Sequence, residues 1–129
     1  MNGYLLDTHV ILRATIRPDE LSAQIKRAIV RGPVTLSVLS WWEVVIKSMK
    51  GKLDVGDHSI WWRAVNQQLV ATQLALKPSH VEEILSLPPI HSDPFDRALI
   101  AQAQAEKLVL ITTDASIALY ASSRLRILS

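Results

Sequence analysis

The chain contains no cysteine among its 129 residues. A disulfide-stabilised scaffold, a zinc knuckle and a thiol nucleophile are therefore excluded, and a bound metal would have to be held by Asp, Glu or His. With 4 Gly and 6 Pro, the composition is also not that of a collagen-like or low-complexity chain. The hydrophobic fraction of 49% instead indicates a compact fold with a core of its own. We expect residues 1–129 to form one domain.

The sequence also lacks a long hydrophobic run and a dominant charge of either sign. The most apolar N-terminal run, Tyr4–Leu12, is interrupted by Asp7 and His9, which makes it too polar and too short for a membrane span or a secretory signal. We therefore expect a cytoplasmic protein with no membrane partner. Fourteen basic residues against twelve acidic ones leave a formal charge of +2, which permits a nucleic-acid partner without requiring one.

Short apolar runs rich in β-formers alternate with helical patterns along the chain. This order is typical of an α/β fold with a mostly parallel sheet flanked by helices. The expected strands are Tyr4–Leu6, Val34–Val38, Gln73–Leu76, Leu108–Thr112 and Arg126–Leu128. The expected helices are Glu20–Arg31, Ser40–Gly51, His58–Ala71, Ser79–Leu87, Pro94–Glu106 and Asp114–Ser122.

Four acidic residues fall at the predicted strand ends or in the first turns of helices: Asp7, Glu43, Asp96 and Asp114. In an open parallel sheet the ligand crevice lies outside the carboxyl ends of the strands, so all four side chains can point into one end of the sheet. Four carboxylates gathered there with no lysine among them would repel one another unless a cation lay between them. Mg²⁺ or Mn²⁺ fits such oxygen ligands, and the chemistry implied is metal-assisted phosphodiester hydrolysis.

Each of these acids also has a structural interpretation. Glu43 follows Ser40 at the spacing of a capping box, and Asp93 is a suitable N-cap for the helix that begins at Pro94. Asp96 would then be an acid favoured by the dipole of that helix.

Asp114 could likewise cap the short helix that follows it. Asp7 is harder to explain in this way, because an acid that ends a buried strand has no helix to cap unless Thr8–Arg13 is helical.

Four motifs occur along the chain in an ordered set. They are Leu5-Leu6-Asp7-Thr8-His9, Ser40-Trp41-Trp42-Glu43 with Lys47 one turn later, His91-Ser92-Asp93-Pro94-Phe95-Asp96-Arg97 with Leu99-Ile100-Ala101-Gln102-Ala103 after it, and Leu110-Ile111-Thr112-Thr113-Asp114. At these residues the chain resembles a PIN domain, specifically a VapC-type toxin ribonuclease of bacterial type II toxin–antitoxin systems. The resemblance extends over essentially the whole chain.

The resemblance implies a parallel sheet flanked by helices and an endoribonuclease that depends on Mg²⁺ or Mn²⁺. The family's acidic quartet falls on Asp7, Glu43, Asp96 and Asp114. The implied metal ligands are Asp7, Asp96 and Asp114, with direct contact mainly from Asp7 and Asp96 and with Glu43 and Asp114 acting partly through water. Asp93 is a candidate fifth member, with the helix cap as its alternative role. The resemblance also implies a homodimer and a small cognate antitoxin whose tail blocks the acidic crevice.

Basic and histidine residues near the motifs have two interpretations each. A set of basic side chains could form a rim that grips RNA phosphates, or it could be an ordinary solvated face in which Glu43 and Lys47 pair at i,i+4. This set is Arg13, Arg17, Lys47, Lys50 and Lys52. His9 and His91 are interpreted as structural hydrogen-bond partners, since a metal-bound water needs no histidine base.

The four tryptophans stand as two doublets, Trp41-Trp42 and Trp61-Trp62. Neighbouring residues on a helix do not face the same side, so we expect one of each pair to be partly exposed. An exposed tryptophan could stack on an RNA base, but it more often marks a protein interface, so we favour a dimer or antitoxin surface.

Two other classes of function remain open at this point. An aspartate-nucleophile phosphatase also ends its first strand in an aspartate, but its mechanism needs a second acid two positions later, where this chain has His9. A metal-binding or protein-binding module without activity would use the acids only to organise a partner site. The RNA target of a nuclease is not encoded in these motifs, because loop shape sets it.

Overall fold

A computed structural model describes residues 3–129 as a five-stranded, entirely parallel sheet in the order β3-β2-β1-β4-β5. The strands are β1 (Tyr4–Leu6), β2 (Val34–Ser37), β3 (Ala71–Leu74), β4 (Val109–Ile111) and β5 (Ile127–Leu128). The predicted α/β fold with a mostly parallel sheet is therefore confirmed.

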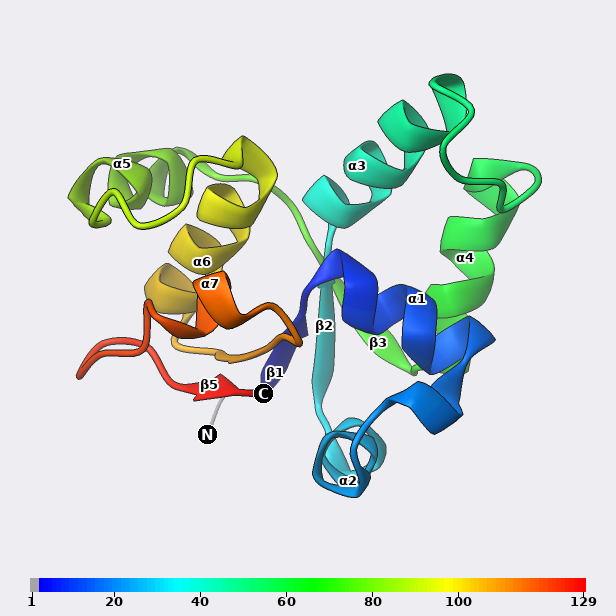
Figure 1. Cartoon of the computed structure of the whole chain (residues 1–129), viewed down its shortest axis with the longest axis horizontal. Helices are drawn as coiled ribbons and strands as arrows, with labels where there is room; N and C mark the ends of the chain where they lie inside the picture. The colour runs from blue at the N-terminus through cyan, green and yellow to red at the C-terminus, as the bar shows by residue number, and fades with distance from the viewer. Residues whose placement is uncertain (1–2) are drawn as a thin grey trace.

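Helices cover both faces of this sheet (Figure 1). They are α1 (Thr8–Ile16), α2 (Ala23–Arg31), α3 (Val38–Met49), α4 (His58–Gln68), α5 (Pro78–Ser86), α6 (Pro94–Glu106) and α7 (Ala115–Ala118), with a 3-10 turn at Pro18–Glu20. Figure 1 shows α1, α2 and α4 on one side of β1 and α5, α6 and α7 on the other, while α3 continues beyond the carboxyl end of β2.

The central strand β1 is buried on both of its faces. Tyr4 and Leu6 belong to a core cluster with residues of α1, α2 and α4, whereas Leu5 belongs to a second cluster with α6 and α7. Alternate residues of a strand point to opposite faces, so a strand covered on both sides must be apolar at every position. This is why every residue of β1 is apolar in the sequence.

The start of β1 requires glycine. Gly3 has φ +102°, and a Cβ at this position would lie 2.4 Å from the carbonyl oxygen of Pro33. That close approach lets the amide of Tyr4 donate to Pro33 at 2.9 Å and brings β1 alongside β2.

Several boundaries differ from the prediction. Thr8–Ile16 is a helix, α1, which the sequence left undecided, and the helix expected from Glu20 begins at Ala23 because Ser22 caps it. The strand expected at Gln73–Leu76 is β3, which begins two residues earlier, at Ala71. The sequence misplaced it because β3 is a half-exposed edge strand with a weak apolar pattern.

The last helix ends at Ala118 instead of Ser122. Within the described part of the chain, no helix combines the length and apolar character needed to cross a membrane.

Candidate metal centre

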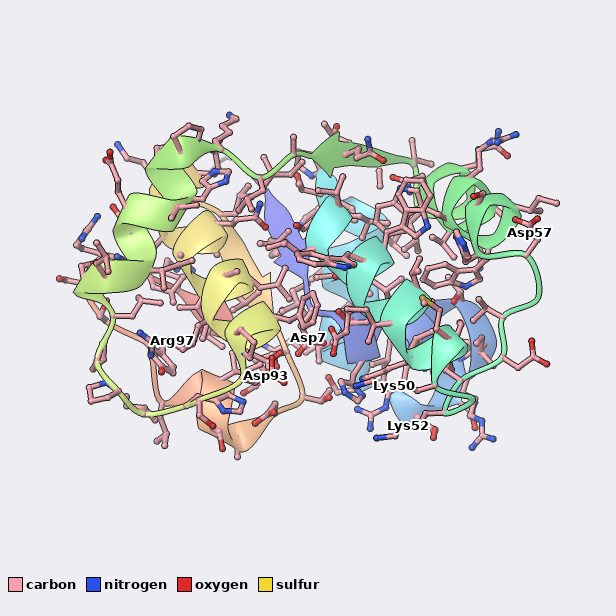
Figure 2. The ribbon with its side chains drawn as sticks, turned by 90° about the horizontal axis from the view of Figure 1, so that it is seen from above. Asp7, Lys50, Lys52, Asp57, Asp93 and Arg97 are labelled. Atoms are coloured by element: carbon pink, nitrogen blue, oxygen red, sulfur yellow. The ribbon has the colours of Figure 1, made fainter. Side chains whose placement is uncertain are left out.

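The four acids singled out in the sequence lie along the carboxyl edge of the sheet. Asp7 follows β1, Glu43 lies on α3 after β2, Asp96 is in the first turn of α6, and Asp114 follows β4. Figure 2, viewed from above this edge, shows Asp7 between α3 and α6. Strand polarity thus brings together segments that are far apart in the sequence.

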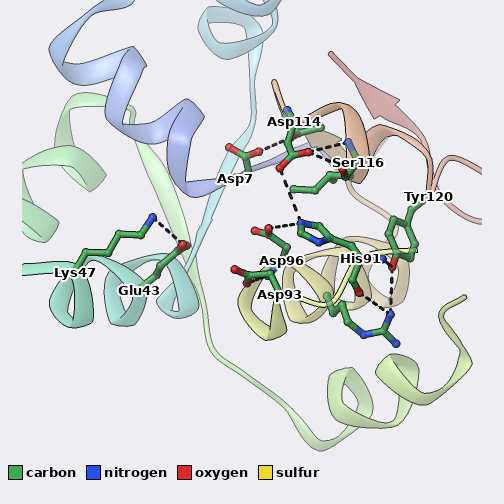
Figure 3. Close-up of polar contacts among 12 residues, drawn as sticks. Asp7, Glu43, Lys47, His91, Asp93, Asp96, Asp114, Ser116 and Tyr120 are labelled. Carbon is green, nitrogen blue, oxygen red and sulfur yellow. Dashed lines mark hydrogen bonds and ion pairs between the residues drawn. The ribbon is translucent and has the colours of Figure 1, made fainter. Parts of the chain in front are cut away.

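The centre of this group is formed by His91, Asp96 and Asp114. Nε2 of His91 lies 2.8 Å from Oδ2 of Asp96 and 4.0 Å from Oδ2 of Asp114. One candidate ligand atom from each of the three residues falls within 4.8 Å of the other two. Figure 3 shows the imidazole between the two carboxylates, with Asp7 beside Asp114 and Asp93 beside Asp96.

His91 is held in this position through its backbone. Its amide donates to the hydroxyl of Tyr120 at 2.8 Å, and its carbonyl accepts from Arg97 at 3.3 Å. Arg97 also donates to the carbonyl of Pro88 and to the Tyr120 hydroxyl. The loop between α5 and α6 is thereby fixed to the start of α6 and to the segment that follows α7.

The environment raises the pKa of Asp96 from 3.8 to about 6. Burial contributes most, followed by the charges of Asp93 and Glu43, while the adjacent His91 acts in the opposite direction. The carboxylates therefore lie close enough to repel one another, as predicted for an acidic centre without its cation.

Asp7 is the most buried of the four acids, at 2% exposed. Oδ2 accepts a short hydrogen bond from the Thr112 hydroxyl, which in turn accepts from the amide of Asp114 at 3.0 Å. Burial raises the pKa of Asp7, the hydrogen bond from Thr112 opposes that shift, and the charge of Asp114 adds to it. Thr112 thus links two of the acids directly.

Glu43 does not form the capping box that its spacing suggested. The helix begins at Val38 with Ser37 as its N-cap, because the Ser37 hydroxyl accepts from the amide of Leu39. Glu43 therefore lies in the second turn, where Oε2 pairs with Lys47 at 3.1 Å. Oε1 is buried and has no hydrogen-bond partner among residues 3–129.

The expectation that no lysine approaches the acids is corrected by this Glu43–Lys47 ion pair. The alternative interpretation of Lys47, as the partner of Glu43 one helical turn away, is confirmed.

Helix capping is confirmed for Asp93 and Asp114, and Asp7, for which the sequence left capping open, caps α1. One oxygen of Asp7 accepts from the amide of Val10, Asp93 accepts from the amide of Asp96, and Oδ1 of Asp114 accepts from Ser116. Asp114 caps α7 with Oδ1 and directs Oδ2 toward His91. A single carboxylate can therefore both begin a helix and present a ligand oxygen.

The basic residues considered as a rim divide into groups. Arg13 donates to the hydroxyl of Thr113, the residue before Asp114, and so lies beside the acids. Arg17 instead approaches Glu20, at 3.9 Å. Lys50 and Lys52 are exposed beyond the end of α3, as Figure 2 shows.

The tryptophan prediction is confirmed for both doublets, since Trp42 is exposed and Trp61 is half-buried. Trp42 is 56% exposed and contacts the edge of Phe95, whereas Trp41 stacks on Trp62 at 5.7 Å between ring centroids. In the second doublet Trp62 is buried in the core, and the half-buried Trp61 packs against the same core cluster from its border.

The fold and the centre together define a class: a parallel α/β protein with acidic residues gathered at the carboxyl edge of its sheet. Residues 4–122 match the model of the PIN domain family, and the chain belongs to this family. The PIN domain predicted from the four motifs is thereby confirmed. A comparison with curated proteins gave no match.

Solved structures with the same fold are similar to this chain at low sequence identity. A chain in the crystal structure of VapBC2 from Rickettsia felis, bound to a DNA fragment from its promoter, has a TM-score of 0.68 at 13% identity, over 96% of both chains. DNA-bound VapBC from Salmonella typhimurium gives 0.66 at 14% identity, over 98% of this chain and 97% of the other. A toxin–antitoxin complex from Klebsiella pneumoniae gives 0.62 at 17% identity, over 95% and 94%.

Sequence reasoning gave too little weight to His91. It assigned the residue a structural role in a loop, and the backbone hydrogen bond to Tyr120 agrees with that. The imidazole, however, lies between Asp96 and Asp114. The available signal was the position of His91, two residues before the Asp93 cap of an acid-bearing helix.

Proposed function

We propose that the protein is an endoribonuclease of the toxin type, dependent on Mg²⁺ or Mn²⁺, with its active site at the group of acids around His91. The observation that carries this proposal is the gathering of four carboxylates, one from each connection between successive strands, at one end of the sheet, with the pKa of Asp96 raised to about 6. Repulsion between carboxylates lowers the stability of the metal-free protein, and a bound cation would relieve it. The arrangement therefore favours the interpretation of these acids as a cation site.

The residues present fit a hard divalent cation. Asp7, Glu43, Asp96 and Asp114 offer carboxylate oxygens, the ligands that Mg²⁺ and Mn²⁺ prefer. Oε1 of Glu43 is buried and lacks a partner in the described chain, as expected for an atom that awaits a ligand or an ordered water. A bound cation would supply an activated water and would neutralise charge that develops on the scissile phosphate.

The chain's own groups would hold and orient this centre. Thr112 fixes the orientation of Asp7, and Lys47 holds Glu43 by one oxygen while leaving the other free. Arg13, held beside Asp114 through Thr113, would receive a phosphate of the RNA. The phosphatase alternative loses support, because His9, where that mechanism needs an acid, is exposed.

We also propose a homodimer and a small antitoxin partner. The similar structures from Rickettsia felis and Salmonella typhimurium are VapBC complexes, and the one from Klebsiella pneumoniae is a toxin–antitoxin complex. On this chain, Trp42 is 56% exposed and Met49 is 81% exposed, seven residues apart on α3. Residues at this spacing share a helix face, so α3 offers an apolar surface suited to a protein partner.

The active-site assignment is tested by comparing Asp96→Asn with Asp57→Asn on single-stranded RNA in Mg²⁺. Asp57, like Asp96, is an aspartate at the start of a helix, but it is the N-cap of α4 and lies away from the acids (Figure 2). We expect Asp96→Asn to lose at least about 100-fold in cleavage rate, whereas Asp57→Asn keeps the wild-type rate. Equal cleavage by both variants would contradict the assignment.

A further inference from the structure

We propose that His91 is a direct nitrogen ligand of the cation in the proposed centre, and that it makes this centre prefer Mn²⁺ over Mg²⁺. The inference rests on the proposed function, because it concerns the cation of the same site. It adds a fifth side chain, of a different donor type, to the carboxylates expected from the sequence.

The Nε2 atom of His91 lies close to a carboxylate without a hydrogen bond to it. Nε2 of His91 is buried and makes no hydrogen bond of acceptable geometry to any described residue, although Oδ2 of Asp96 is only 2.8 Å away. A histidine that serves only to hold Asp96 would donate Nε2–H along the line to that oxygen. Two polar atoms that are close but misaligned are instead arranged as neighbouring ligands of a third atom.

The separations between the three candidate ligand atoms are close to those around one octahedral ion. Octahedral ligands at about 2.1 Å from an ion lie about 3.0 Å apart when adjacent and about 4.2 Å apart when opposite. Nε2 of His91 is 2.8 Å from Oδ2 of Asp96 and 4.0 Å from Oδ2 of Asp114, and the whole set falls within 4.8 Å. Changes of about 1 Å in these separations would bring all three atoms into contact with one ion.

The loop that carries His91 is held in place by residues of the protein itself. Tyr120 follows α7, which Asp114 caps, and Arg97 is the neighbour of Asp96 on α6. These two residues bond to the backbone of His91 on both sides, through its amide and its carbonyl. The elements that carry the two carboxylates therefore also fix the loop that carries the imidazole, as expected for a ligand set held by its supporting residues.

The preference for Mn²⁺ follows from donor chemistry. Mg²⁺ binds oxygen ligands and retains water, and it gains little from an imidazole. First-row transition ions bind imidazole nitrogen readily, so one histidine among carboxylates strengthens their binding selectively. The other three histidines differ: His80 is fully buried against Glu106, His58 accepts from the indole of Trp41 at the start of α4, and His9 is exposed on α1.

The test is pulsed electron paramagnetic resonance on the untagged, full-length protein loaded with Mn²⁺ alone, together with titrations of Mn²⁺ and of Mg²⁺ monitored by calorimetry. We expect nitrogen coupling from a directly bound imidazole in the wild type and in His9→Gln, and its loss in His91→Gln. His91→Gln should also lose at least about 10-fold in Mn²⁺ affinity. A loss of about this size is already typical when a residue that only hydrogen-bonds to a metal ligand is substituted. Its Mg²⁺ affinity should change less than about threefold.

The wild-type spectrum decides the matter even if His91→Gln does not fold. Bound Mn²⁺ without nitrogen coupling, in a protein that still cleaves RNA, would overturn the role of His91 and leave the proposed function intact. Coupling that persists in His91→Gln would also overturn it. A wild-type chain that binds neither cation would overturn both this inference and the proposed function.

Discussion

At the scale of single residues, the aspartates of this chain perform two tasks with two oxygens. Asp114 caps α7 through Oδ1 and faces His91 through Oδ2. Asp7 caps α1 with one oxygen and accepts from Thr112 with the other. A helix that begins at the carboxyl edge of a parallel sheet needs an acceptor there, and an aspartate supplies it while bringing charge to the site.

The raised pKa of Asp96 predicts the direction in which the stability of the metal-free protein changes with pH. The pKa of Asp96 in the folded chain, about 6, lies above the ordinary value of 3.8, so between these values the folded state binds more protons than the unfolded state. The contribution of Asp96 to the free energy of unfolding of metal-free protein should therefore be fully present below about pH 4, be lost as the pH rises through about 6, and then stay constant. Asp93, Glu43 and His91 are the ionisable neighbours that set this shift.

Asp96→Asn should remove this loss and leave metal-free protein more stable than the wild type at pH 7, by about 1–2 kcal/mol. This range allows for the smaller favourable interaction of Asp96 with the helix dipole. The variant should also lose most of its stabilisation by Mg²⁺. Thermal and urea unfolding from pH 4 to pH 8, with and without Mg²⁺, measure both effects.

Asp93→Asn is the matched control for this variant, because asparagine caps a helix about as well as aspartate. It should keep the wild-type response to Mg²⁺. If Asp96→Asn were less stable than the wild type and still responded to Mg²⁺, Asp96 would be only a first-turn acid of α6.

Residue identities at the site were largely predictable, and their surroundings were not. Asp7, Glu43, Asp96 and Asp114 could be selected because strand ends and helix starts leave a readable pattern. The pairing of Glu43 with Lys47 depended on where α3 begins, and Ser37 and Ser40 are equally good caps by sequence. The position of the His91 side chain depended on Tyr120, which is 29 residues away.

At the scale of elements, the loop between α5 and α6 is clamped by one tyrosine hydroxyl. The hydroxyl of Tyr120 accepts from the amide of His91 and from Arg97, and it donates to the carbonyl of Pro88 at 3.0 Å. Together these bonds fix the approach of the loop to the acids.

Tyr120→Phe should therefore destabilise the protein by about 1–3 kcal/mol, since buried groups lose their partner, and it should weaken Mn²⁺ binding as well. Tyr4→Phe is a matched control, because the Tyr4 hydroxyl accepts from Arg31 at 2.8 Å at the other end of β1. Chemical denaturation and calorimetry of both variants make the comparison. Equal cation affinity in the two variants would show that the clamp does not position the centre.

Element boundaries were predictable where caps and apolar patterns agree. The helix from Pro94 to Glu106 and the strand from Tyr4 to Leu6 were predicted to the residue. The edge strand β3 was misplaced because its half-exposed side chains carry little pattern. The helix α1 was left open because Asp7 could be interpreted either as a strand end or as a cap.

At the scale of the whole molecule, the two faces of the sheet carry separate cores, to which alternate residues of β1 and β4 contribute. One core lies under α1, α2 and α4, and the other lies under α6 and α7. The acids come from elements on both faces, with Asp7 at the start of α1 on one face and Asp96 and Asp114 at α6 and α7 on the other, while Glu43 comes from α3, which follows the carboxyl end of β2.

We expect the free protein to be a dimer, because the exposed apolar residues of α3 are better buried than left in water. Light scattering at high micromolar concentration should give twice the 14.4 kDa of the chain. Trp42→Ala should shift the population toward monomer, while Trp62 and the core remain unchanged. A wild-type monomer at that concentration would contradict the dimer.

The most direct test of the central claim is cation-dependent cleavage of single-stranded RNA by the purified wild-type protein. The protein is first treated with EDTA, and Mg²⁺ or Mn²⁺ is then added back in steps. The account predicts no cleavage in EDTA and recovery with either ion, with Asp96→Asn inactive throughout. Full cleavage in EDTA would contradict the assignment of the acids around His91 as a metal-dependent active site.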